Sequence, residues 1–409
     1  MNILMLADAF YADKPGGSRV VARETARMLV TRGHRVTLLV ARQVEGTPDE
    51  EMVMGFRVVR YAGAGHVAAF VKQGRAGAAR LWRESPFDIV HTHFAYAAHG
   101  PARAFPPDAL HVRTFYGPWD GEGRVEDTAR FEAASNRAQK VKLHLQRAVK
   151  SRLKHRIEAQ SLARSRAVIV LSAQSRGEAL KYGVEAAKIH QIAPGVDTAR
   201  FALPIGGKDA ARRALGLKSG GPLLFCVRRL VPRMGLVNLI LAMRIVADAH
   251  PQALLLIGGQ GPERANLEKQ IVALKLERNV RLLGFVAEND LSTYYGAADL
   301  FVLPTLALEG FGLVTVEALA CGTPALGTPV GATLEILGAL NAKLLASSAD
   351  ADGLARGILN YLGAAHCAEF SAARMRDFVL RNYNWERHVD EVEALYCRLI
   401  EEKSKETGL

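Results

Sequence analysis

Short apolar runs alternate with segments of helical periodicity from the start of the chain. Asn2 to Leu6 is an apolar run that predicts a strand, and Val36 to Val40 predicts the next one. Between them, Gly16-Gly17-Ser18 opens a helix that we expect to run to about Arg32, where Gly33 ends it. A strand, a helix and a second strand in this order are typical of a βαβ unit with parallel strands.

The same alternation continues in two series, which are separated by a segment rich in Gly, Lys and Ala at 203–221. The first series has four more strand candidates: Phe56 to Tyr61, Ile89 to His91, His111 to Thr114 and Ala167 to Leu171. The second series has five: Leu223 to Val227, Ala253 to Ile257, Val280 to Leu283, Leu300 to Leu303 and Pro324 to Leu326. A chain of 409 residues is also too long for one ordinary core. We therefore predict an α/β fold of two Rossmann-like domains, residues 1–202 and 203–384, that face each other across a cleft.

The composition excludes several classes of protein. Hydrophobic residues make up 49% of the chain and charged residues 23%, which is ordinary for a globular protein. No apolar stretch approaches the roughly 20 residues that span a bilayer, and the first residues, MNILMLADAF, are typical of a strand rather than of a signal peptide. The four cysteines form no C-x-x-C pair, which argues against a structural zinc site and a disulfide framework. We therefore expect a cytoplasmic protein.

Positive charge is unevenly distributed along the chain. The formal net charge is +12, and residues 131–166 carry ten Lys/Arg against two Glu. Residues 138–158 place apolar side chains at intervals of four among these basic ones, which predicts a basic amphipathic helix. The helix could dock on an anionic membrane surface, which would make the protein peripheral on the inner face of the membrane. Alternatively, it could pack on its own sheet with a solvated basic face. No nucleic-acid-binding motif accompanies the charge, so we expect no nucleic-acid partner.

The chemistry concentrates in the loop Glu309-Gly310-Phe311-Gly312 and in the helix that follows it. A helix N-terminus favours a phosphate, and the two glycines let a ligand approach the backbone closely. Glu309 can accept hydrogen bonds from sugar hydroxyls, while Glu317, two turns into the helix, can reach a ribose. This spacing suits a nucleotide-activated sugar, although an acid at a helix start and an unrelated surface glutamate would give the same pattern.

Glu309 to Glu317 resembles the E-x7-E motif of retaining glycosyltransferases with the GT-B fold, above all those of glycosyltransferase family 4. The resemblance covers nearly the whole chain. It implies a catalytic Glu309, and a donor-binding set that comprises Glu317 together with Gly310, Phe311, Gly312, Leu313 and Val314. It also implies that the C-terminal helix, at about 385–409, packs back on the first domain.

The segment RRLVPRMG at 228–235 is similar to the family's G-R-L-x-x-x-K-G, whose Arg and Lys hold the donor diphosphate. The resemblance gives a catalytic role to Arg229, the matching arginine. Arg228 replaces the family's glycine. Met234 stands at the lysine position and cannot neutralise a phosphate. Arg233, one residue earlier, could supply the cation instead, because a guanidinium binds phosphate bidentately. Both arginines could also be solvated surface residues.

Three further segments match the family at expected strand ends. Gly284-Phe285-Val286 is similar to the G-x-V segment whose backbone contacts the nucleotide base. Gly17 lies in a segment similar to the family's G-G loop, whose backbone approaches the donor diphosphate or the acceptor. His91-Thr92-His93 resembles the family's H-x-H, which implies that His93 reaches the donor sugar. The alternatives are a tight turn at Gly17, a core side chain at Phe285 and a structural histidine. No third ligand is visible that would make the histidine pair a zinc site.

Arg113 and Tyr116 lie at another strand end of the first domain. They could line an acceptor pocket, because aromatic faces suit sugar rings. Core packing explains the aromatic residues of this segment almost as well.

The resemblance implies transfer of a sugar from a UDP- or GDP-sugar to a hydroxyl of a glycan, glycolipid or small-molecule acceptor, with retention at the anomeric carbon. We expect neither a bound cofactor nor a required metal, because no D-x-D motif stands in a suitable place. A nucleotide-sugar epimerase shares the architecture. An inactive nucleotide-sugar-binding scaffold is a second alternative, for which Met234 is the only hint. The E-x7-E spacing favours transfer.

Overall fold

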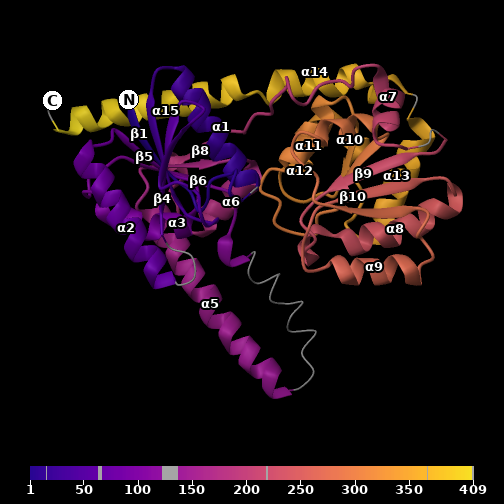
Figure 1. The fold of residues 1–409 in the computed structure, drawn as a ribbon, viewed down its shortest axis with the longest axis horizontal. Helices are drawn as coiled ribbons and strands as arrows, with labels where there is room; N and C mark the ends of the chain where they lie inside the picture. Colours follow the sequence, from indigo (N-terminus) through magenta and orange to yellow (C-terminus); the bar gives the residue numbers. More distant parts are fainter. Residues whose placement is uncertain (15, 63–66, 122–136, 218–219, 366, 408–409) are drawn as a thin grey trace. The chain divides into compact units, whose positions relative to one another are not determined.

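The computed structural model describes residues 1–14, 16–62, 67–121, 137–217, 220–365 and 367–407. The chain folds into two compact units, each built round one β-sheet (Figure 1). The first unit contains the described residues of 1–121, 142–195 and 385–407, and the second is built mainly from 196–384. The predicted α/β class with two Rossmann-like domains is confirmed.

The first unit has an eight-stranded sheet in the order β3-β4-β2-β1-β5-β6-β7-β8. All neighbouring strands are parallel except β3 and β4. The strands are β1 (Asn2–Leu6), β2 (Arg35–Ala41), β3 (Glu50–Val53), β4 (Phe56–Tyr61), β5 (Ile89–Thr92), β6 (His111–Phe115), β7 (Ala167–Val170) and β8 (Ile189–Gln191). The strand order reverses between β1 and β5, and ligands of open α/β sheets bind where the order reverses.

Helices cover both faces of this sheet. In Figure 1, α1 and α15 lie on one side, and α2, α3 and α5 lie on the other. Their bounds are α1 (Gly17–Thr31), α2 (Val67–Glu84), α3 (Ala95–His99), η1 (Pro101–Ala104), α5 (Arg137–Ala163), α6 (Ala173–Lys181), η2 (Ala186–Lys188) and α15 (Trp385–Thr407).

The C-terminal helix α15 is part of the first unit. His388 Nε2 lies 3.0 Å from Thr25 Oγ1 of α1. The Tyr396 hydroxyl lies 2.6 Å from His91 Nδ1 of β5. These buried polar contacts fix the position of α15 along the sheet, because a shift of the helix would leave each group without its partner.

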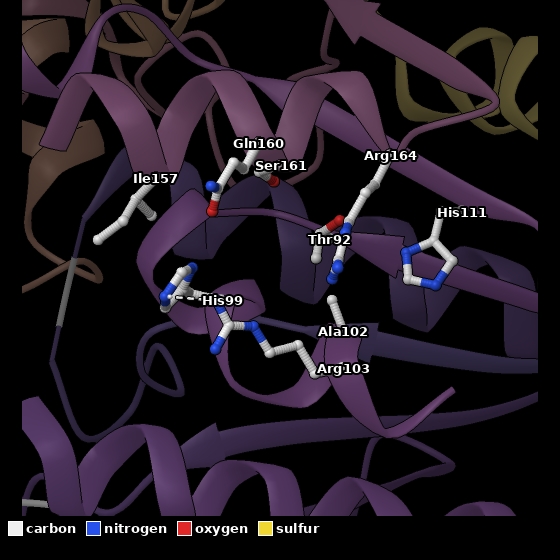
Figure 2. A pocket seen from close by; sticks show the side chains of 9 residues that line it. All are labelled: Thr92, His99, Ala102, Arg103, His111, Ile157, Gln160, Ser161 and Arg164. Atoms are coloured by element: carbon white, nitrogen blue, oxygen red, sulfur yellow. Dashed lines mark hydrogen bonds between the residues drawn. The ribbon is translucent and has the colours of Figure 1, made fainter. Parts of the chain in front are cut away.

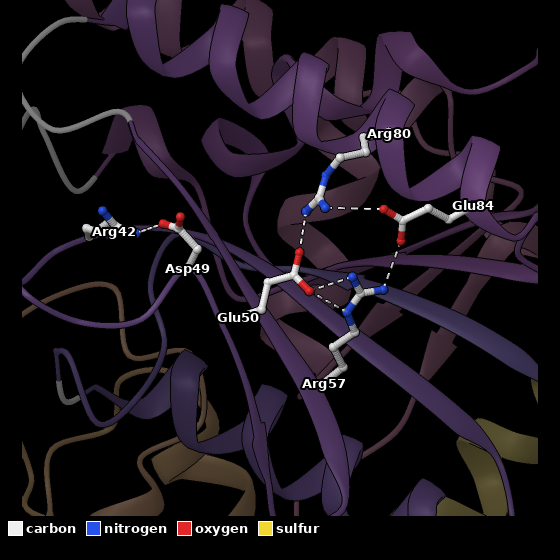
Figure 3. A network of polar contacts seen from close by, with 6 residues as sticks. All are labelled: Arg42, Asp49, Glu50, Arg57, Arg80 and Glu84. Atoms are coloured by element: carbon white, nitrogen blue, oxygen red, sulfur yellow. Dashed lines mark hydrogen bonds and ion pairs between the residues drawn. The ribbon is translucent and has the colours of Figure 1, made fainter.

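The edge strand β3, which forms a hairpin with the predicted strand β4, was not predicted from the sequence. Its turn contains Met54 (φ 48°) and Gly55 (φ 84°), two successive residues with the positive φ that favours tight hairpins. Glu50 of β3 accepts from Arg57 Nη2 of β4 and from Arg80 Nη2 of α2, both at 2.6 Å (Figure 3). The two arginines lower the pKa of the Glu50 carboxyl. The hairpin is therefore tied to α2 mainly by exposed charges, which is why no apolar alternation revealed β3.

The second unit has a five-stranded parallel sheet in the order β11-β10-β9-β12-β13. The strands are β9 (Leu223–Val227), β10 (Leu254–Gly258), β11 (Val280–Gly284), β12 (Leu300–Leu303) and β13 (Ala325–Gly327). The helices are α7 (Gly207–Ala214), η3 (Pro232–Met234), α8 (Leu236–Ala249), α9 (Arg264–Ala273), α10 (Leu291–Ala297), α11 (Leu313–Ala320), α12 (Ala332–Leu340), η4 (Ala342–Leu344), α13 (Ala351–Ala364), η5 (Ala368–Phe370) and α14 (Ala372–Asn382). Every residue of β12 is fully buried, which matches the unbroken apolar run that predicted it.

The predicted basic helix at 138–158 lies within α5. Ile157 is buried, but Val149 and Leu153 are 58% and 54% exposed. The described part of the apolar stripe therefore packs on the unit only near its C-terminal end. The side chains of residues 138–145 lie outside the described part. Among the helices that the structure describes, none is long and apolar enough to cross a membrane.

Candidate functional site

The second sheet reverses its strand order between β9 and β12, and the predicted donor residues follow these two strands. Arg228 comes directly after β9, and the loop from Pro304 to Gly312 follows β12 and leads into α11. The carboxyl ends of parallel strands meet at one edge of a sheet. The topology therefore brings together two segments that are about 80 residues apart in the sequence.

An ion pair lies at the centre of this edge. Arg228 Nη2 contacts Glu309 Oε2, and both side chains are only 9% exposed. Thr305 Oγ1 donates to the same carboxylate oxygen at 3.0 Å. Arg228 Nη2 also lies 2.8 Å from the Met234 sulfur. Glu309 is therefore held through Oε2, and its Oε1 makes no hydrogen bond with another residue that the structure describes.

The Glu309 loop has a strained backbone that glycine positions make possible. Leu308 has φ 60°, and Gly312 caps α11 in the left-handed region with φ 81°. A Cβ on Gly331 would lie 2.0 Å from the Glu309 carbonyl oxygen, so only glycine fits beside the loop. Arg233 Nη1 donates to the Leu308 carbonyl at 3.0 Å. Arg233 thus supports the loop backbone.

Glu317 lies on α11 and faces a buried tyrosine of α10. The Tyr295 hydroxyl donates to Glu317 Oε2 at 2.8 Å. Burial, and then the Glu317 charge, raise the pKa of Tyr295 well above its usual value. Tyr295 therefore stays protonated and orients the Glu317 carboxylate as a fixed donor.

The remaining predicted donor residues line the same edge. Arg229 is exposed. Gly284 has φ 77°, and its carbonyl accepts from Gly259 N at 2.6 Å. Phe285, which follows it, is 61% exposed, so this side chain is not in the core. Of the predicted loop and helix residues, Phe311 and Gly312 are buried, while Gly310, Leu313 and Val314 are partly exposed.

The predicted residues of the first unit also come together at a strand-order reversal, between β1 and β5. The His93 ring follows β5, and its Nδ1 lies 2.8 Å from the Tyr116 hydroxyl. That hydroxyl donates to the Ser18 carbonyl at 3.2 Å, next to Gly17 at the start of α1. Because the single hydroxyl proton points to a carbonyl, Nδ1 of His93 carries the proton that Tyr116 accepts.

His93 is electrically neutral in this arrangement. It is 1% exposed, and burial, followed by the neighbouring His91, Arg113 and His388, lowers its pKa well below the usual value. With Nδ1 protonated, Nε2 is left as a bare acceptor, and it is buried without a hydrogen-bond partner among the described residues. Buried polar atoms are rarely left unpaired, so this nitrogen is suited to a ligand hydroxyl.

Arg113 has a structural position. It is 1% exposed, and its Nη2 donates to the buried Glu158 of α5 at 2.9 Å. A guanidinium that is fully buried and paired in this way fixes α5 to β6, and its position does not support the interpretation of Arg113 as an acceptor residue.

Sequence reasoning missed Arg228 as a site residue. It treated Arg228 as a replacement for a glycine and Met234 as a missing lysine, one position at a time. In the structure the two side chains touch. The sequence did contain an indication of this contact. Within one short segment, the chain differs from the family pattern at two positions: it gains a cation at Arg228 and loses one at Met234.

The described part of the chain contains no group of three or more His, Cys, Asp or Glu side chains that could hold a metal ion. Positive charge at the β9–β12 edge comes from arginines, and no side chain caps the N-terminus of α11.

Comparisons with protein families agree across both units. A model described as "Glycosyltransferase Family 4" matches residues 15–200, and a model described as "Glycosyl transferases group 1" matches residues 207–371. Among individual relatives, the chain is 35% identical over 201 residues to a GDP-mannose-dependent monoacylated alpha-(1-6)-phosphatidylinositol monomannoside mannosyltransferase of Corynebacterium glutamicum. That alignment covers 47% of this chain and 51% of the relative, so the chain spans about half the length of this relative.

Two solved structures show the same fold over almost the whole chain. Sucrose-phosphate synthase from Thermosynechococcus elongatus has a TM-score of 0.78 at 23% identity, and covers 97% of this chain and 98% of that one. HepE from Anabaena in complex with UDP-glucose has a TM-score of 0.74 at 21% identity, with 97% and 99% covered. The predicted GT-B fold is confirmed.

Proposed function

We propose that this chain, which its two family models place in glycosyltransferase family 4, transfers a hexose from a nucleotide-sugar donor, and that the Glu309 loop binds the donor's hexose. One observation carries this proposal. The Glu309 carboxylate is held at Oε2 by Arg228 and Thr305, while Oε1 has no partner among the described residues. A carboxylate locked at one oxygen presents the other in a fixed direction to sugar hydroxyls.

Charge at the β9–β12 edge suits the leaving diphosphate. The N-terminus of α11 follows Glu309 within four residues and attracts phosphate oxygens. Arg228 adds a guanidinium beside Glu309, where Met234 cannot supply a cation. Glu317, positioned by Tyr295, accepts hydrogen bonds from the ribose hydroxyls. Exposed Arg229 provides a further cation for the diphosphate.

The proposed transfer retains configuration at the anomeric carbon. The bond from C1 to the diphosphate oxygen breaks, and the electron pair leaves with the diphosphate. The acceptor oxygen then bonds to C1 from the side that the diphosphate leaves, and its proton passes to the departing phosphate oxygen. The protein stabilises the charge that builds up on the diphosphate, so the step requires no separate base.

His93 contributes a hydrogen-bond acceptor in this proposal. Its bare Nε2 can accept a hydrogen bond from a sugar hydroxyl, which the Nδ1-protonated ring cannot do through its other nitrogen. Such a contact orients the sugar without adding charge near C1.

The donor is a UDP- or GDP-sugar, and the acceptor is a glycan or lipid-linked hydroxyl. The Corynebacterium relative is named for GDP-mannose and a monoacylated phosphatidylinositol monomannoside, and the Anabaena structure holds UDP-glucose. Arginines and a helix N-terminus supply the positive charge, so we propose that transfer proceeds without a metal ion.

The deciding experiment measures release of nucleoside diphosphate from a panel of UDP-, GDP- and ADP-sugars. We expect slow release from one donor, and a loss on the order of 100-fold or more in Glu309→Gln, which removes the charge but keeps the shape. Glu268→Gln is a matched control, because Glu268 is exposed on α9 and, among the described residues, pairs with Arg264 alone, at 2.9 Å. An epimerase would convert a donor without releasing the diphosphate. Binding without any turnover, even with acceptors present, would favour an inactive scaffold.

A further inference from the structure

A pocket lies in the first unit between η1 and the C-terminal end of α5 (Figure 2). Thr92 of β5 lines it on the side of the sheet that α5 covers, whereas His91 contacts Tyr396 of α15 on the other side. Successive residues of a strand point to opposite faces. The pocket is therefore separate from the His91–His93 cluster, and no step of sugar transfer uses it.

The lining is basic and contains no carboxylate. Four of its nine residues are His99, Arg103, His111 and Arg164. Arg103 Nη2 lies 3.4 Å from His99 Nε2, and the Arg164 side chain forms no ion pair or hydrogen bond with another described residue. Some other arginines of this unit form ion pairs, as Arg113 does with Glu158 and Arg60 with Asp13. Two exposed cations without a carboxylate partner beside one cavity repel each other weakly, and an anion in the cavity would be attracted to both.

A buried histidine faces the pocket without a partner. His111 is only 8% exposed, and its ring forms no hydrogen bond with another residue that the structure describes. Burial and the nearby Arg164 lower the pKa of His111 to about 4, and burial, then Arg103 and Arg164, lower that of His99. Both rings are thus neutral at pH 7, and each can donate one N–H while the arginines supply the charge.

We propose that this pocket binds a phosphate group. Two guanidinium groups can hold phosphate oxygens bidentately, and the N–H of His111 and the hydroxyl of Ser161 can complete the shell. The phosphate belongs either to a soluble phosphorylated ligand or to a lipid headgroup. A headgroup would fit the exposed Val149 and Leu153 of α5, the helix that forms one wall of the pocket.

The test compares wild-type protein with Arg103→Gln/Arg164→Gln. Both arginines are exposed, so the change should not disturb the fold. Arg278→Gln is the control, since it removes an exposed cation of the second unit. Inorganic phosphate is titrated by calorimetry, and vesicles of phosphatidylcholine with and without phosphatidic acid are tested by co-sedimentation. Because the donor site also attracts phosphate, only the binding that the double variant loses is assigned to the pocket.

We expect the double variant to bind at least one probe about tenfold or more weakly than wild type, with Arg278→Gln unchanged and release of nucleoside diphosphate from the donor within about twofold of wild type. A loss confined to phosphatidic acid vesicles identifies a lipid headgroup, and a loss with inorganic phosphate identifies a soluble ligand. Equal binding by the double variant and the Arg278→Gln control to both probes would overturn the proposal. That result would leave the sugar-transfer proposal intact, because donor turnover is measured separately.

Discussion

The Glu309 cluster (Glu309, Arg228 and Thr305) and the His93 cluster (His93 and Tyr116) occupy equivalent places in the sheets of their units. In each unit the strand order reverses between two neighbours, β1 and β5 in one and β9 and β12 in the other. His93 follows β5 and meets the start of α1, while Glu309 follows β12 and meets Arg228 after β9. One cluster is a neutral hydrogen-bonded chain, and the other is an ion pair.

The same topology thus carries two kinds of recognition. A carboxylate with a guanidinium and a helix N-terminus suits an anionic diphosphate and sugar hydroxyls at once. A buried imidazole with one bare nitrogen suits a single hydroxyl and resists protonation. The shared topology of the two units therefore determines where each site lies, whereas the side chains determine which ligand it recognises.

The largest effect on donor turnover should come from moving the positive charge of Arg228 to another position in the Glu309 cluster. Arg228→Gly should lower donor turnover on the order of 100-fold, because the buried cation beside Glu309 is lost. Met234→Lys should also lower it, since an ammonium would lie close to the guanidinium that now contacts the sulfur at 2.8 Å. The double variant Arg228→Gly/Met234→Lys should recover much of the loss, because it restores one cation at the same place.

The measurement is steady-state donor turnover of the wild type, the two single variants and the double variant, which together form a double-mutant cycle. Thermal unfolding checks that each protein is folded. Additive losses in the double variant would show that the two positions act independently. In that case Arg228 would only position Glu309, and the diphosphate charge would be met elsewhere, by Arg229 or the helix N-terminus.

A smaller effect should follow from changing the neutral cluster. His93→Leu removes the acceptor at Nε2 and should lower kcat/KM for the donor about tenfold, the contribution of one hydrogen bond. His93→Gln places an oxygen near the same point and should retain most of the rate. Tyr116→Phe removes the partner that fixes the proton on Nδ1, so its loss should be intermediate. If His93→Gln is as slow as His93→Leu, the nitrogen is not acting as an acceptor.

The sequence predicted the framework of both clusters for clear physical reasons. The run Leu300–Leu303 is apolar because β12 is covered on both faces, and the glycines before Glu317 permit the loop that leads into α11. The edge strand β3 was invisible because its stabilising contacts are charged and come partly from α2. A strand that is buried on both faces can be recognised from its apolar sequence. The stability of an edge strand depends on contacts from neighbouring elements, which its own sequence does not show.

The sequence could not predict side-chain pairing over long separations. Arg113 meets Glu158, which is 45 residues away, and that contact turns a candidate sugar ligand into a structural ion pair. The tautomer of His93 depends on a carbonyl at Ser18, far away in the chain. A local sequence pattern can locate the end of a strand. The residue that pairs with a side chain at that strand end, and so determines its chemistry, belongs to a different βα unit.

A separate effect, on stability rather than on turnover, is expected for the first unit in acid. Burial lowers the pKa of His91 to about 3 and that of His388 to about 4, from the usual 6.5. Because the unfolded chain binds these protons more readily, each histidine stabilises the fold above pH 6.5. That stability is lost as the pH falls towards 4, by about 1.4 kcal/mol per pH unit for each group. Tryptophan fluorescence during urea unfolding reports this unit alone, since Trp82, Trp119 and Trp385 all belong to it. His388→Gln should reduce the slope of the free energy of unfolding against pH by the contribution of one proton. An unchanged slope would mean that His388 is accessible to protons in the folded state.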